Sequence, residues 1–167
     1  MGLLEPHGRG RRAFRRDALS GATAPPIIVI HSLAHAVAAL NAAAGADRDI
    51  ILLSAADAGI YAGAGWFKAV VEAARNTVPA ARFSEILDCG DHTGAVQVAL
   101  RAGVVAVIFT GRSDVAERLA AIAKQKNSRL LAARPPHALD LAADFFADAE
   151  TLRRQCADVL ASLPPIC

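Results

Sequence analysis

The stretch Phe83–Phe109, FSEILDCGDHTGAVQVALRAGVVAVIF, decides the fold. An apolar run at 83–87 is followed by a helical pattern at 94–102 and then by a second apolar run at 104–109. The run at 104–109 is apolar throughout, and the run at 83–87 is apolar except at Ser84 and Glu85. Continuous rather than alternating apolar runs are typical of strands in a parallel sheet that is covered on both faces. Two parallel strands joined by a helix predict a right-handed crossover.

The same alternation continues on both sides of this stretch. It predicts further strands and helices over 27–30, 33–44, 50–53, 66–78, 114–126, 129–132 and 149–163. We therefore expect the α/β class, as a three-layer sandwich with an open, mainly parallel, five-stranded sheet. A half-barrel-like (βα) repeat is the alternative, since a closed eight-stranded barrel needs about 200 residues or more. The pattern does not assign a structure to 135–148.

Charge and composition set the expected domains and partners. Of the 167 residues, 1–24 are expected to form a flexible basic tail and 25–167 a single α/β domain. Arg11-Arg12 resembles a twin-arginine export signal, but prolines and polar residues interrupt the uncharged stretch that follows it. Three cysteines without a CxxC pair favour a reducing cytoplasm. We expect no membrane partner, no nucleic acid because aromatic content is only 5%, and a possible homodimer through alanine-rich helices.

Part of the chain resembles a known family. Asp49–Lys126, including GDHTGAVQVALRAG at 90–103, is similar to a degenerate response-regulator receiver, which implies a flavodoxin-like fold. The family's functional residues are not carried over. The phosphoacceptor region holds Ser54, the acidic pair after the first strand is His31-Ser32, and Thr110-Gly111 replaces the lysine and proline. The rhythm is equally similar to phosphate-binding βα barrels such as small aldolases, so the resemblance implies fold more than activity.

Candidate site residues lie where strands end, because ligands of parallel α/β sheets sit at that edge. Glycines just before a helix let free backbone amides approach an anion, and nearby cations or hydroxyls would add to the attraction. These considerations predict an anion site composed of Gly63, Gly65, Lys68, Thr110, Arg112 and Arg134. The alternative is that the glycines merely form a turn while Trp66 and Phe67 pack against the sheet.

The densest group of reactive side chains follows the third strand, in Asp88-Cys89-Gly90-Asp91-His92-Thr93. Asp88 and His92 are the candidates for proton transfer. A nucleophilic Cys89 would need a stabilised thiolate, and the plainer interpretation is that Asp91 or Thr93 caps the next helix. We expect no metal and no cofactor, because neither this cluster nor the pair His31 and His35 has further ligands at recognisable spacing.

Two functions follow from these features. The first is a binding or regulatory module without an intact catalytic motif, which recognises a small anion or a protein partner. The alternative is a small enzyme that acts on a phosphorylated or carboxylate-bearing metabolite at the carboxyl ends of the strands, with Asp57 among the groups at that edge.

Overall fold

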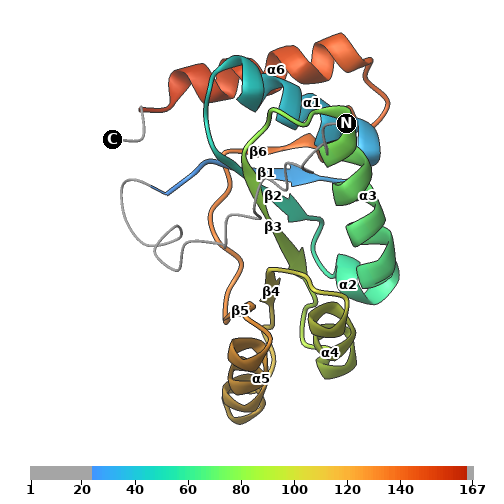
Figure 1. Ribbon diagram of the computed structural model, residues 1–167, viewed down its shortest axis with the longest axis vertical. Coiled ribbons are helices and arrows are strands. Elements are labelled where there is room, and N and C mark those ends of the chain that lie inside the picture. The colour runs from blue at the N-terminus through green and yellow to red at the C-terminus, as the bar shows by residue number, and fades with distance from the viewer. Residues whose placement is uncertain (1–23, 165–167) are drawn as a thin grey trace, which may run out of the picture.

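The computed structural model describes residues 24–164 and contains one open, all-parallel sheet of six strands (Figure 1). The strands are β1 Ile27–Ile30, β2 Ile50–Ser54, β3 Phe83–Asp88, β4 Ala106–Ile108, β5 Arg129–Leu131 and β6 Leu139–Asp140. The helices are α1 Leu33–Gly45, α2 Ala58–Tyr61, α3 Gly63–Thr77, α4 Thr93–Arg101, α5 Ser113–Gln125 and α6 Ala149–Ser162, with a 3₁₀ turn, η1, at Leu141–Asp144. In space the strands follow the order β5-β4-β3-β2-β1-β6.

This arrangement confirms the expected fold class, since alternating helices and strands in one open parallel sheet are consistent with a three-layer α/β fold. The predicted number of strands is wrong: there are six rather than five. The additional strand, β6, is two residues long and lies in the segment that the sequence pattern does not assign. It pairs with β1, in the register Ile28 with Leu139 and Val29 with Asp140.

The helices lie side by side in the same order as the strands that they follow. Neighbouring pairs are α6 with α1, α1 with α3, α3 with α4, and α4 with α5, a succession that can be followed around the sheet in Figure 1. The buried apolar residues of these five helices belong to one core cluster with alternate strand residues such as Ile28 and Leu52. A second, smaller cluster consists of strand residues, among them Val29, Leu53 and Ile108.

Alanine explains the close packing of α1 against α6. Five buried alanines of α1 (Ala36, Ala38, Ala39, Ala42 and Ala43) lie in the same cluster as Leu152, Cys156 and Leu160 of α6. Small side chains let two helix backbones approach, and larger residues on the partner then fill the space between them. Ser32 caps the N-terminus of α1, since its hydroxyl accepts a hydrogen bond from the amide of His35.

At the carboxyl edge of the sheet, α2 packs directly on the end of β3. A Cβ on Gly59 would stand 2.7 Å from the sulfur of Cys89, so only a glycine allows this approach. Gly90 has a φ of +52°, and a Cβ there would collide with the carboxylate of Asp57. These two glycines therefore bring the loop after β2 and the loop after β3 together.

A search for membrane-spanning helices gave a negative result within residues 24–164: each helix there is too short or too polar to cross a bilayer.

Candidate functional site

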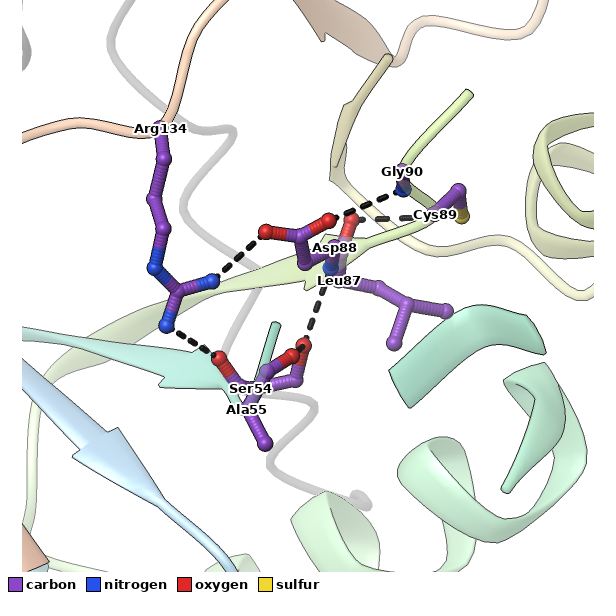
Figure 2. A network of polar contacts seen from close by, with 7 residues as sticks. All are labelled: Ser54, Ala55, Leu87, Asp88, Cys89, Gly90 and Arg134. Carbon is purple, nitrogen blue, oxygen red and sulfur yellow. Dashed lines mark hydrogen bonds and ion pairs between the residues drawn. The ribbon is translucent and has the colours of Figure 1, made fainter. Parts of the chain in front are cut away.

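A polar network joins the carboxyl ends of β2 and β3 to the loop after β5 (Figure 2). The guanidinium of Arg134 donates to Asp88 Oδ2 at 2.6 Å and to the carbonyl of Ser54 at 2.9 Å. The other carboxylate oxygen of Asp88 accepts the amide of Gly90, and the hydroxyl of Ser54 accepts the amide of Asp88. We call Ser54, Asp88, Gly90 and Arg134 the strand-end network.

The strand-end network satisfies its own buried groups. Asp88 is only 4% exposed, so its charge needs a partner, and Arg134 supplies it. The hydroxyl of Ser54 also donates to the carbonyl of Ala55. The sequence prediction selected Asp88 for proton transfer and Arg134 for anion binding, and the structure brings the two together as partners of each other.

The two other predicted cations also hold carboxylates. Lys68 Nζ lies 2.9 Å from Glu85 Oε1, in the interior on the helix side of β3. Arg112 donates to both carboxylate oxygens of Asp114 on the surface. The N-terminus of α5 has no side-chain capping hydrogen bond. Asp114 lies in the first turn of this helix, and its carboxylate contacts Arg112, the residue just before the helix. The three predicted cations thus lie in three separate ion pairs.

The remaining predicted anion ligands are two glycines of α3 and Thr110, which lies just beyond the end of β4. Gly63 is the first residue of α3, with a φ of +83°, and Gly65 is the third residue of the same helix. Within residues 24–164, and apart from the adjacent backbone of α3 itself, no atom lies within 4 Å of the position that a Cβ would take at either glycine. The amide of Thr110 donates to the carbonyl of Gly90, which joins the ends of β3 and β4. Anion binding by this set remains a prediction.

The loop after β3 is a helix cap rather than a nucleophile site. His92, rather than Asp91 or Thr93, caps the N-terminus of α4: its Nδ1 accepts the amide of Ala95 at 3.0 Å. Burial, with a further contribution from Asp88, raises the pKa of the Cys89 thiol to about 12, so the thiol stays protonated at neutral pH. His92 therefore has a structural role at one ring nitrogen.

A pocket of about 420 Å³ lies at the carboxyl ends of β1 and β2, between α2, the start of α3 and η1. Its lining consists of five alanines, three aromatic side chains and one histidine: Ala55, Ala56, Ala58, Ala62, Ala142, Tyr61, Trp66, Phe145 and His31. We call it the β1–β2 pocket. Tyr61 is 85% exposed and Trp66 36%, and Phe145 is exposed as well. Large apolar side chains are usually covered, so a group of exposed aromatics around one hollow indicates a binding surface.

His31 contributes a polar group to this pocket. Its Nε2 lies 2.7 Å from Oδ1 of Asp140, and the two side chains are held by the neighbouring strands β1 and β6. The same oxygen of Asp140 accepts the amide of Ala142 at the start of η1. Burial alone would raise the pKa of Asp140, but the hydrogen bonds from His31 and Ala142 outweigh it and hold the pKa below its ordinary value. The carboxylate is therefore ionised at neutral pH.

His35 contacts both the backbone and the ring of His31. The imidazole of His35 is fully buried, and its Nδ1 accepts the backbone amide of His31 at 3.2 Å. It packs edge-on against the rings of His31 and Phe145. Burial, and next the proximity of His31, lowers the pKa of His35, so its ring stays neutral. Its Nε2 has no hydrogen-bond partner within the described part of the chain.

Sequence reasoning missed this pocket. It treated His31 and His35 together as a weak metal pair, placed Trp66 against the sheet, and did not assign the segment that holds Asp140 and Phe145. The feature of the sequence that could have indicated the pocket is the aromatic pair Phe145-Phe146, which is conspicuous in a chain with few aromatic residues and is exposed in the structure.

Among residues 24–164, no three histidine, cysteine, aspartate or glutamate side chains gather as metal ligands. Comparison of the chain with family models and with curated proteins gave no match.

Proposed function

We propose that this chain is a binding module for a small organic molecule, which it holds in the β1–β2 pocket. The observation that carries the proposal is the grouping of Tyr61, Trp66 and Phe145 around a hollow at the carboxyl edge of a parallel sheet. Ligands of open parallel α/β sheets bind at this edge. Pockets lined by apolar and aromatic groups with a few polar groups are typical of small-molecule sites.

The proposal can be tested by filling the pocket. Ala142 lines the pocket and is exposed, so Ala142→Leu narrows the hollow without disturbing the core. Ala143 is the next residue of η1, is exposed too, and does not line the pocket, which makes Ala143→Leu the matched control. A thermal-shift panel would contain choline, indole, inorganic phosphate and citrate. A ligand at a hundred times its dissociation constant stabilises a protein by about 2.7 kcal/mol.

We expect at least one compound to raise the melting temperature of the wild type and of Ala143→Leu, but not that of Ala142→Leu. Equal shifts in all three proteins would place binding elsewhere. A shift caused by phosphate or citrate alone and lost in Arg134→Met would instead support the predicted anion site.

A second candidate function is general-base catalysis in the same pocket, favoured by the contact between His31 and Asp140. A carboxylate that holds one imidazole nitrogen fixes the orientation of the ring and stabilises the imidazolium formed when the other nitrogen accepts a proton. Here the other nitrogen is Nδ1 of His31. Hydrolysis of nitrophenyl esters that is lost in His31→Gln and retained in His92→Gln would support catalysis. Absence of turnover across such substrates would leave the binding module.

The predicted homodimer, receiver ancestry and cytoplasmic location stand beside this proposal as separate predictions. Gel filtration with light scattering tests the first of them.

A further inference from the structure

We infer that the ligand of the β1–β2 pocket carries a cationic ammonium group; this inference rests on the proposed function. The pocket presents the side chains of Tyr61, Trp66 and Phe145. Each aromatic ring carries negative charge density on its face, and several rings around one hollow form a favourable site for an ammonium group. Trp is the most favourable of the three ring types.

The charged groups around the pocket favour a positively charged ligand. None of the nine lining residues is a lysine or an arginine. One carboxylate is held against a lining residue: Asp140 contacts His31, and it is ionised because its pKa lies below the ordinary value. A positively charged ligand would be repelled by unpaired cations nearby. Each of the three predicted cations is instead bound to a carboxylate outside the pocket lining: Lys68, Arg112 and Arg134. The electrostatic complement of this pocket is therefore positive.

The alternative ligand is a neutral apolar molecule of the same shape. Such a molecule would use the five alanines and the ring surfaces but would gain nothing from the charge of Asp140. A pair of probes separates the two: choline, and 3,3-dimethyl-1-butanol, in which a carbon replaces the quaternary nitrogen. Cation–π attraction at an exposed ring is worth about 0.5–1 kcal/mol, and because more than one ring lines this pocket we expect choline to bind about tenfold more tightly.

The chain offers a direct readout of binding. Trp66 is the only tryptophan of the sequence and lies on the pocket, so its fluorescence reports on this site. Both probes are titrated into the full chain at constant ionic strength, with sodium chloride as the compensating salt. Tyr61→Leu removes one ring at a position that is already largely exposed, and Phe146→Leu removes a neighbouring exposed ring that does not line the pocket.

The expected result is saturable quenching by choline, about tenfold weaker binding of the neutral alcohol, and a loss of this preference in Tyr61→Leu but not in Phe146→Leu. Equal affinity for the two probes would overturn the cationic ligand and leave the proposed pocket intact. A preference for choline that survives Tyr61→Leu would overturn the aromatic site. No saturable response to either probe would overturn the inference, and if the thermal-shift panel is also flat, the proposed function fails with it.

Discussion

The ion pair between Lys68 and Glu85 provides a quantitative test of the packing between α3 and β3. Glu85 is only 2% exposed, and its Oε1 lies 2.9 Å from Lys68 Nζ. Lys68→Met keeps most of the aliphatic stem but leaves the carboxylate buried without its partner. Removing one partner of a buried pair costs about 3–5 kcal/mol. Because the Lys68 side chain is 20% exposed, we expect the lower end, about 3 kcal/mol, and a fall in melting temperature of about 10 °C.

The assay is urea denaturation at pH 7, followed by far-ultraviolet circular dichroism, on Lys68→Met and on the double variant Lys68→Met/Glu85→Met. A buried pair replaced by well-packed apolar residues is often neutral or stabilising, so the double variant should recover to within about 1 kcal/mol of the wild type. Arg112→Met is the control, since its exposed pair with Asp114 is worth less than about 1 kcal/mol. A loss below 1 kcal/mol in Lys68→Met, or a double variant as unstable as the single one, would refute this reasoning.

Three further predictions concern the backbone, pH and the cysteines. Gly90→Ala should lower the free energy of unfolding by about 1–3 kcal/mol, because the positive φ of this residue and the neighbouring carboxylate both oppose a Cβ. Gly45→Ala should be near neutral, because no neighbouring group lies where its Cβ would stand, and urea denaturation of both variants checks this. The pKa of His35 is lowered in the folded chain, so below about pH 6.5 the unfolded chain binds a proton at this residue that the folded chain does not bind. The free energy of unfolding should therefore fall by up to about 1.4 kcal/mol per pH unit below that point. His35→Asn should flatten this dependence, and an unchanged slope would count against it. Burial raises the thiol pKa of Cys89 to about 12 and of Cys156 to about 11, so iodoacetamide at pH 8 should modify both in urea and neither in the folded chain, as peptide mapping would report.

The fold was predictable where apolar runs are long enough to show a period. The strand that ends in Ser54 is continuously apolar up to that residue, and the strand that ends in Asp88 is apolar except at Ser84 and Glu85. The amphipathic helices α3 and α4 come after them in the chain. β6 could not be predicted in this way, because two residues carry no period and Asp140 is polar. Its pairing with β1 is a contact between segments far apart in sequence, which local pattern does not encode.

Sequence and structure lead to candidate residues at the same edge of the sheet, but to different ones. The rule that ligands bind at the carboxyl edge of a parallel sheet selected the edge at which the β1–β2 pocket also lies. Residue chemistry alone then favoured charged side chains such as Lys68 and Arg134, and the structure shows that both neutralise carboxylates. Whether a charged group is free or paired depends on tertiary contacts, so sequence could not decide it. The pocket aromatics were overlooked because Trp66 lies beside a buried phenylalanine in the chain, and both were expected in the core.

The most direct test of the central claim is a map of amide chemical shifts during titration with whichever of choline, indole and inorganic phosphate binds most tightly. A pocket at the ends of β1 and β2 predicts that the largest changes fall on residues 55–62, 66 and 142–145. Changes centred on Thr110, Arg112 and the strand-end network, with the pocket residues unmoved, would contradict the claim.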